Sequence, residues 1–288
     1  GLGLFAVLPP VESLMAGSTL GEVSSFTFAG LLLLRSARGR KTGRTAPLRG
    51  ILRIAAPVVS GSFLRSGLNS VENLLAPQGL RRYGVSYAES LSQYGRVQGA
   101  AMPVLLFPAA VVSSLGSMLV PELAAAAARG DKAAIRRSAG RAIRFTLAFS
   151  FFITAFLVAF AVPLCRLLFH SEEAGRLLRV MAPVVPLMYV DSVVDSMLKG
   201  LDQQMFAFRC NLADSLLRVA AVAVCVPLWG MAGYVGILFF SELYNASLSD
   251  YRLLRVTELE VDVTSWVLAP AVAAALLYYL LSPLAALL

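Results

Sequence analysis

The sequence predicts an all-α membrane protein, a polytopic helical bundle with about eight transmembrane helices. Of its 288 residues, 58% are hydrophobic and only 15% are charged, and the mean hydropathy is +0.73. A soluble domain usually carries roughly a quarter charged residues, so this composition argues against a soluble enzyme. No segment shows the apolar–polar alternation of a half-buried strand. Helices satisfy their own backbone hydrogen bonds, as a chain in lipid requires.

Three segments predict transmembrane helices by length alone. Residues 97–121, 145–165 and 264–288 contain no Asp, Glu, Lys, Arg or His, and each reaches the ~20 residues that a bilayer requires. A fourth uncharged run contains Pro227 and Gly230 and predicts two helices joined by a tight turn. The complete set of predicted helices is 11–34, 51–75, 97–121, 145–168, 177–200, 207–228, 230–249 and 264–286.

The formal net charge of +8 comes mainly from the connections between these helices. The connections 35–50 and 122–144 are the richest in Lys and Arg, and such loops stay on the cytoplasmic side of the cell membrane. We therefore expect both to face the cytosol. Residues 122–144 either lie along the inner head-group layer or extend the neighbouring helices. The basic balance thus indicates a lipid bilayer as the partner, and no nucleic acid.

The ends of the sequence indicate a fragment of a longer protein. Gly1 is not an initiator Met, and the apolar segment 1–8 is too short to span a bilayer. The last predicted helix stays apolar up to Leu288. We therefore expect that part of the protein precedes or follows this chain.

Side chains suited to catalysis are sparse. The single His, His170, lies in a predicted outer loop beside Glu172 and Glu173. One His cannot build a common metal cluster or a catalytic triad. The GxxxxGK[ST] pattern, which cradles phosphates, is absent. The sequence therefore predicts neither an enzyme nor a bound cofactor or metal ion.

Polar residues inside predicted spans are more informative, because ionisable groups there are costly and usually face a cavity or a partner. At 100° per residue, a polar stripe covers an arc of about 120° on the helix 51–75. Its members are Ser62, Arg65, Ser66, Asn69, Glu72 and Asn73. The stripe predicts a substrate cavity in which Arg65 is offered to an anion. The alternative is an Arg65–Glu72 ion pair enclosed within the bundle.

Prolines interrupt the predicted helix 97–121. Pro103 and Pro108 lie within it, and each removes a backbone donor and kinks the helix. The segment is therefore suited to bending as a gating helix. A static kink that fits the packing is the alternative.

Two pairs of charged residues lie four positions apart, about one turn of a helix. Asp191 and Asp195 lie on one face of the helix 177–200, where a carboxylate pair can bind a cation or share a proton. Asp214 and Arg218 have the same spacing, which predicts an intrahelical ion pair with a structural role.

Three stretches together resemble a known family. Residues 94–122 read YGRVQGAAMPVLLFPAAVVSSLGSMLVPE, residues 51–80 read ILRIAAPVVSGSFLRSGLNSVENLLAPQGL, and residues 197–204 read MLKGLDQQ. They are similar to signature segments of the stage V sporulation protein B and polysaccharide exporter (flippase) family. That family is part of the multidrug/oligosaccharidyl-lipid/polysaccharide exporter superfamily.

The resemblance implies two six-helix lobes around a central cavity. On this basis residues 1–34 are the tail of the first lobe, 35–50 are a basic linker, 51–249 are the second lobe, and 264–288 are an extra helix. The resemblance also implies that the protein flips lipid-linked oligosaccharides or polysaccharide precursors for cell-envelope or spore-cortex synthesis. The substrate would be a polyprenyl-pyrophosphate-linked sugar, and Arg65 matches the cavity arginines that engage the pyrophosphate.

Two other functions remain open at this point. One is a cation-coupled exporter of small drugs, which the same superfamily contains and which carboxylates such as Asp191 and Asp195 would suit. The other is a non-transporting membrane scaffold that recruits envelope synthases.

Overall fold

The computed structural model describes residues 20–21, 23–28, 30–31 and 48–286. Contacts divide the chain into two compact units, residues 1–58 and 59–288. Most of the predicted helix 11–34 and linker 35–50 lies outside the described residues, although the described part of 11–34 is helical. The features below belong to the larger unit.

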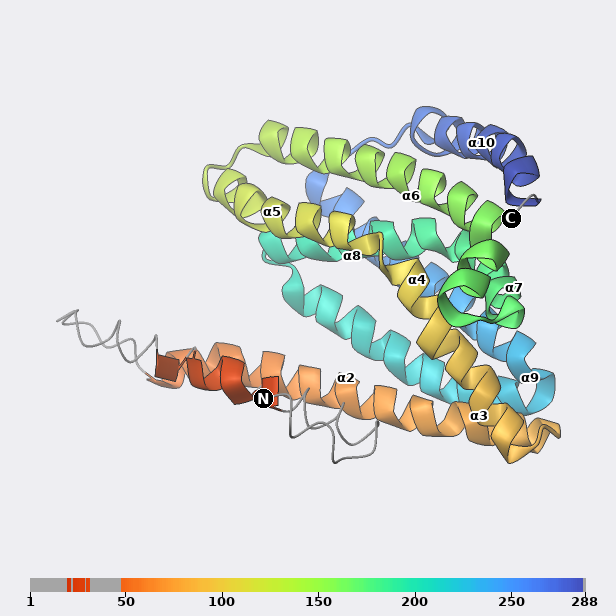
Figure 1. Ribbon diagram of the computed structural model, residues 1–288. Helices are drawn as coiled ribbons and strands as arrows, with labels where there is room; N and C mark the ends of the chain where they lie inside the picture. The colour runs from red at the N-terminus through yellow and green to blue at the C-terminus, as the bar shows by residue number, and fades with distance from the viewer. Residues whose placement is uncertain (1–19, 22, 29, 32–47, 287–288) are drawn as a thin grey trace. The chain divides into compact units, whose positions relative to one another are not determined.

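The described residues contain helices and no strand, which confirms the all-α prediction. The elements are α2 (Leu48–Tyr83), α3 (Tyr87–Arg96), the π-helical turn η1 (Val97–Ala101), α4 (Met102–Leu106), α5 (Ala109–Ala128), α6 (Lys132–Phe169), α7 (Glu172–Met181), the 3-10 turn η2 (Ala182–Val184), α8 (Val185–Gly200), α9 (Gln204–Thr257), the π-helical turn η3 (Thr264–Leu268) and α10 (Ala269–Ala286) (Figure 1). Within the described part, five helical segments are long and apolar enough to cross a membrane. They are Ala109–Ala128, Lys132–Phe169, Glu172–Gly200, Gln204–Thr257 and Thr264–Pro283.

The longest helix, α9, contains the turn that the sequence predicts at Gly230. Gly230 has φ 60° and ψ −141°, outside the helical region, and glycine tolerates a positive φ because it has no Cβ. Ser241 donates a hydrogen bond to Asp214, so residues on either side of the turn face each other. α9 is therefore two helices that run in opposite directions, as Figure 1 also shows.

The segment 122–144 extends two helices, which is the second of the two predicted alternatives. α5 continues to Ala128 and α6 begins at Lys132. Between them Gly130 has φ 70°. The side chain of Asp131 caps α6 by accepting a hydrogen bond from the backbone N–H of Ala134 at 2.9 Å. An Asp at this position satisfies one of the free N–H groups of the first turn.

Contacts between connections show which of them lie at the same end of the larger unit. At one end, Arg96 pairs with Glu173 of α7 at 3.0 Å, and Gly230 lies against the ring of Tyr83. The α2–α3, α6–α7 and mid-α9 connections therefore share an end.

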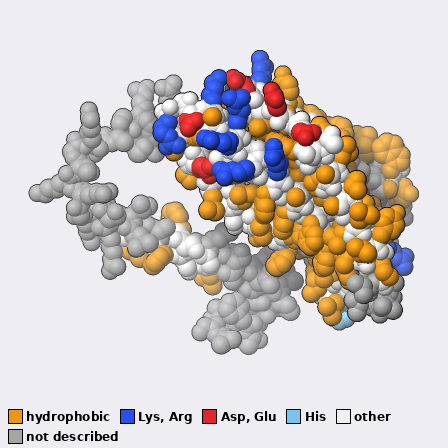
Figure 2. Space-filling model, turned by 90° about the horizontal axis from the view of Figure 1, so that it is seen from above, with side chains coloured by type: hydrophobic (Ala, Val, Ile, Leu, Met, Phe, Trp, Pro, Cys, Tyr) orange, Lys and Arg blue, Asp and Glu red, His pale blue; other side chains and the backbone are white. Residues whose placement is uncertain are grey.

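The opposite end holds the remaining connections of the larger unit. Lys132 pairs with Glu258 at 2.7 Å, and Arg252 donates to Gln203 at 3.1 Å. The hydrogen bond from Lys132 holds the pKa of Glu258 below its usual range. The space-filling view shows charged side chains gathered in one region beside an extensive hydrophobic surface (Figure 2). The two groups of connections alternate along the chain, as helices that cross a bilayer back and forth require.

Glycines let the helices of this unit approach closely. A Cβ at Gly200 of α8 would lie 2.8 Å from the backbone oxygen of Val120 of α5. A Cβ at Gly175 of α7 would lie 2.6 Å from Cα of Val162 of α6. Such close backbone packing by small residues is the main source of helix association in membranes, where lipid is as apolar as the side chains.

We predict that Gly175→Ala destabilises the protein by about 1–3 kcal/mol, because a rigid backbone must move to admit the methyl group. Thermal unfolding of the purified protein in detergent measures this effect. Gly236→Ala is the matched control, since Gly236 is also helical and a Cβ there meets nothing within 4 Å. Equal unfolding temperatures for the two variants would contradict the close α6–α7 contact.

Candidate functional site

The predicted polar stripe lies on α2, at the margin of the larger unit. Arg65, Asn69 and Asn73 are exposed in this unit, and so are apolar residues of the same helix, including Phe63 (75%) and Leu74 (65%). Ser66 is exposed as well, and the side chain of Ser62 lies outside the described residues. The stripe is therefore open to a ligand or a partner along most of its length.

Glu72 is the member of the stripe that the fold buries. Its carboxylate pairs with Arg218 of α9, with 2.8 Å between Oε2 and Nε. The side chains are 6% and 20% exposed. Arg218 also donates from Nη2 to Oδ1 of Asn69 at 3.2 Å. A single guanidinium thus joins α2 to α9.

This geometry corrects two sequence predictions. Glu72 pairs with Arg218 rather than with Arg65, so the proposed Arg65–Glu72 pair is wrong. Arg218 reaches across to α2 instead of pairing with Asp214, one turn away on its own helix, and Asp214 accepts a hydrogen bond from Ser241 at 2.6 Å. The physical reason is burial: Glu72 is the more enclosed carboxylate and needs a counter-charge more than Asp214 does.

Two tyrosines and a glutamine extend this arrangement. Tyr94 donates to Oδ1 of Asn73 at 2.6 Å, and Gln98 donates to the hydroxyl of Tyr234 at 3.0 Å. Tyr234 in turn donates to Oε1 of Glu72 at 3.4 Å. The rings of Tyr94 and Tyr234 meet edge to face, with centroids 5.6 Å apart. We call the whole set the guanidinium network; it comprises Asn69, Glu72, Asn73, Tyr94, Gln98, Arg218 and Tyr234.

The predicted carboxylate pair lies in a second polar group, between α8 and the two arms of α9. Asn245 donates to Oδ2 of Asp191 at 2.9 Å, and Asn211 donates to Oδ2 of Asp195 at 3.1 Å. Asn245 also donates to Oδ1 of Asn211 at 3.3 Å. Asp191 and Asn245 are both more than nine-tenths buried. We call these four residues the carboxylate cluster; oxygens of Asp191, Asp195 and Asn245 remain without a hydrogen-bond partner in it.

Between the two groups lie two further carboxylates. Asp214 and Glu242 are within electrostatic range of each other and of the guanidinium of Arg65. Arg65 therefore interacts with the acidic interior of the unit while its own side chain is exposed. An anion at Arg65 would compete with these carboxylates for its positive charge.

The prolines of the predicted gating helix coincide with real interruptions. Pro103 is the second residue of α4, which follows the π-helical turn η1, and Pro108 lies at the break between α4 and α5. At this break the carbonyl of Leu105 accepts a hydrogen bond from the buried hydroxyl of Tyr189 at 2.7 Å. A neighbouring helix thus satisfies a backbone group near the interruption, as non-helical backbone at membrane depth requires.

Sequence reasoning missed most of the amide and aromatic partners. Tyr94 and Gln98 stand inside the family-like stretch 94–122, yet nothing local marks them as partners of α2. Asn211 and Asn245 could have been predicted to make interhelical hydrogen bonds, because an amide within an apolar helix must find a hydrogen-bond partner. Each lies on a predicted span.

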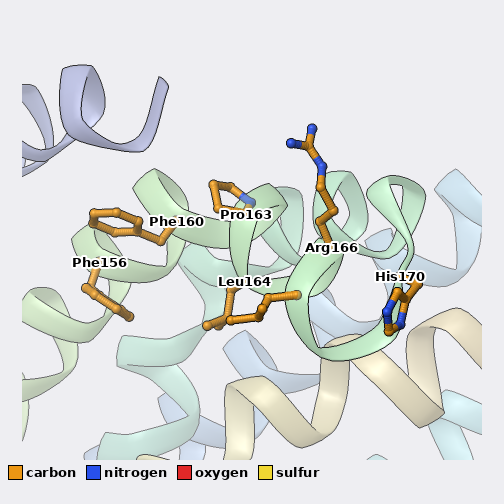
Figure 3. Close-up of a pocket in the computed structure, with 7 residues that line it drawn as sticks. Phe156, Phe160, Pro163, Leu164, Arg166 and His170 are labelled. Atoms are coloured by element: carbon orange, nitrogen blue, oxygen red, sulfur yellow. The ribbon is translucent and has the colours of Figure 1, made fainter. Parts of the chain in front are cut away.

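A groove on the surface of α6 is apolar, unlike the guanidinium network and the carboxylate cluster. It encloses about 490 Å³ and is lined mainly by Phe156, Phe160, Pro163 and Leu164 (Figure 3). Arg166 at its end pairs with Glu172 at 2.8 Å. The apolar lining suits hydrocarbon rather than a polar cargo.

The fold and its polar interior define a polytopic all-α membrane protein with paired charges between its helices. Residues 90–224, from α3 into the first arm of α9, match the MatE family. This match confirms the resemblance to the exporter superfamily, and it agrees with the prediction that the chain is not an enzyme.

Two curated proteins of Bacillus subtilis (strain 168) are similar to the chain. Stage V sporulation protein B is 23% identical over 229 residues, which cover 77% of this chain and 43% of that protein. Sporulation protein YkvU is 27% identical over 133 residues, which cover 46% of this chain and 30% of that protein. The chain thus spans less than half the length of either relative. No solved structure matches it significantly.

We predict that Glu72→Ala destabilises the protein by about 3–5 kcal/mol, because it leaves the Arg218 guanidinium buried without a counter-charge. The second change Arg218→Leu should recover a large part of this loss. A double-mutant cycle of thermal unfolding in detergent measures the coupling. Leu74→Ala, on the exposed side of the same helix, serves as the control. Additive effects of the two changes would rule out the ion pair as a stabilising contact.

Proposed function

We propose that the protein is a transporter that flips lipid-linked oligosaccharide or polysaccharide precursors across the cytoplasmic membrane. The MatE match supports membrane export, and the names of both relatives support a role in sporulation. Spore-cortex or cell-envelope synthesis would use such a precursor. The observation that carries the proposal is the exposed guanidinium of Arg65 on the polar side of α2.

Arg65 suits the pyrophosphate of a polyprenyl-linked sugar. A guanidinium offers a planar fork of donors that makes paired, charge-assisted hydrogen bonds to phosphate oxygens. Ser66, Asn69 and Asn73 are also exposed on α2 and can hydrogen-bond to the cargo. Movement of the anion outward gains ~2.3 kcal/mol per charge per 100 mV of inside-negative potential. Envelope synthases are candidate partners that would receive the flipped product.

Alternating access supplies the mechanism in this proposal. We assign residues 51–249 to the second of two lobes, 264–288 to an extra helix, and 1–34 to the tail of the first lobe. Such lobes rock against each other around a site near the membrane centre. The interruptions at Pro103 and Pro108 would let the η1–α5 segment bend as a gate. The carboxylate cluster would take up a cation or proton as the coupling site.

The carboxylate cluster also favours one other function, a cation-coupled exporter of small drugs. Buried carboxylates attract cationic substrates, and the cluster contains no basic residue. The exposed Arg65 weighs against this function because it would repel a cationic drug. A non-transporting scaffold would need neither feature.

We predict that Arg65→Ala lowers the flipping rate of a polyprenyl-pyrophosphate-linked sugar at least about tenfold. This change in rate corresponds to the loss of roughly 1.4 kcal/mol of stabilisation of the anion as it crosses the membrane. Arg65→Lys should retain an intermediate rate, because it keeps the charge but loses the fork. Flipping is measured with the full-length protein, which contains both lobes, reconstituted into vesicles. Arg136→Ala, an exposed arginine at the start of α6, is the control.

An unchanged flipping rate in Arg65→Ala would remove Arg65 from the mechanism. Drug efflux that depends on a sodium or proton gradient and disappears in Asp195→Asn, without any flipping, would replace the proposal by the drug exporter. Absence of both activities from the reconstituted full-length wild-type protein would favour the scaffold.

We further propose that the connections 35–50 and 122–144 face the cytosol. The end of the unit that holds the α5–α6 connection carries the exposed residues Arg129, Lys132, Arg136 and Arg137, in line with the positive-inside rule. A cysteine introduced at Ala133 should resist a membrane-impermeant thiol reagent in intact cells and react after lysis. A cysteine at Ala88, at the other end, should react in intact cells. The reverse pattern would invert the orientation.

A further inference from the structure

A polar cavity lies at the turn between α2 and α3, away from the guanidinium network and the carboxylate cluster. It encloses about 560 Å³, and its lining residues are Gln78, Arg81, Arg82, Val85, Ser86 and Tyr87. Nothing in the proposed transport cycle uses this cavity. Its volume falls in the range of about 300–1,000 Å³ that is typical of ligand pockets.

The turn that forms the cavity is fixed by backbone hydrogen bonds. Gly84 has φ 110°, and its N–H donates to the carbonyl of Arg81 at 3.1 Å. The N–H of Val85 donates to the carbonyl of Leu80 at 3.1 Å. This pair of bonds is the Schellman arrangement, which ends a helix with a glycine in a left-handed conformation. Ser86 then caps α3 by accepting from the N–H of Glu89. The wall of the cavity is thus built from two defined helix ends.

Both arginines of the cavity have N–H donors that pair with no carboxylate of the described residues. The guanidinium of Arg81 lies 5.2 Å from the ring centroid of Tyr87, which orients it. Within residues 48–286, no ion pair to a carboxylate involves Arg81 or Arg82. The acidic group of the adjoining α3, Glu89, is held by Arg96 at 2.7 Å. Two adjacent guanidiniums without a counter-ion favour an anionic ligand with several oxygens.

The surface beside the cavity favours a ligand with an apolar chain. Val71 and Leu74 are exposed on α2 (43% and 65%). At 1.5 Å per residue, Leu74 lies ~10 Å along the helix from Arg81. The exposed Tyr83 and Tyr87 are aromatic residues of the kind that sit at the membrane interface. The apolar surface of α2 thus leads to the paired arginines, and the two exposed tyrosines lie beside these arginines. A lipid's chain followed by its phosphate has the same order.

We propose that this cavity binds the phosphate group of a membrane lipid whose chain lies along the exposed apolar side of α2. The two guanidiniums hold the phosphate oxygens, and the ring of Tyr87 keeps Arg81 in place. The lipid is either an anionic phospholipid of the bilayer or a polyprenyl pyrophosphate, since both present phosphate oxygens at the end of an apolar chain. The site is independent of flipping through Arg65.

Native mass spectrometry of the delipidated protein in detergent tests this site. The probes are phosphatidylglycerol, undecaprenyl pyrophosphate and inorganic pyrophosphate, each titrated separately. The double variant Arg81→Gln/Arg82→Gln should bind the lipid at least about tenfold more weakly than the wild type, because charge-assisted hydrogen bonds to phosphate are lost. For undecaprenyl pyrophosphate, every protein compared also carries Arg65→Ala, which removes the pyrophosphate site proposed above. The matched control is Arg136→Gln/Arg137→Gln, which removes the same charge from two adjacent exposed arginines at the opposite end. It should bind within about twofold of the wild type.

The two lipid probes identify the source of the phosphate, because the one that loses affinity in the Arg81/Arg82 variant is the ligand. Three results would overturn the proposal. They are unchanged lipid binding in the Arg81/Arg82 variant, an equal loss in the Arg136/Arg137 control, and equally tight binding of inorganic pyrophosphate, which would remove the need for an apolar chain. Unfolding temperatures of both variants confirm that the fold is retained.

Discussion

The larger unit depends on one interaction between its helices, the ion pair between Glu72 and Arg218. Transfer of two charges out of water costs several kcal/mol per ion, and only close pairing with further hydrogen bonds offsets that cost. Asn69 supplies such a bond to Arg218, and Tyr234 supplies one to Glu72. The pair therefore holds α2 against α9, because each of these largely enclosed charges needs the other as its counter-charge.

This interaction in turn depends on the break at Gly230. Arg218 lies on the first arm of α9 and Tyr234 on the second, yet both reach Glu72. A continuous helix would carry Tyr234 away, since sixteen residues span ~24 Å of helix axis. The same break brings Asn245 back to Asn211. One glycine with a positive φ thus positions residues of both polar groups.

The sequence predicted the elements of the fold better than the contacts between them. The apolar runs and the turn at Gly230 were predictable because each depends on local composition or backbone freedom. The partner of Arg218 was not predictable, because the spacing of i and i+4 residues describes contacts within one helix and not contacts between helices. It pointed to Asp214, whereas burial of Glu72 decided the outcome. The sequence predicted the polar stripe on α2. It did not predict that Glu72 alone is buried among the side chains of the stripe that the structure describes.

The guanidinium network and the carboxylate cluster differ in whether their charges are paired. Among the ion pairs of the described spans, that of Glu72 and Arg218 is the one buried between helices. Asp191 and Asp195 have amide donors but no basic partner in ion-pair contact. A buried carboxylate without a counter-charge is costly, so its amide donors matter to the stability of the unit. Arg65, by contrast, is exposed and available to an anion. Enclosed carboxylates and an exposed guanidinium thus separate negative from positive charge within the unit, and the proposed transport rests on this separation.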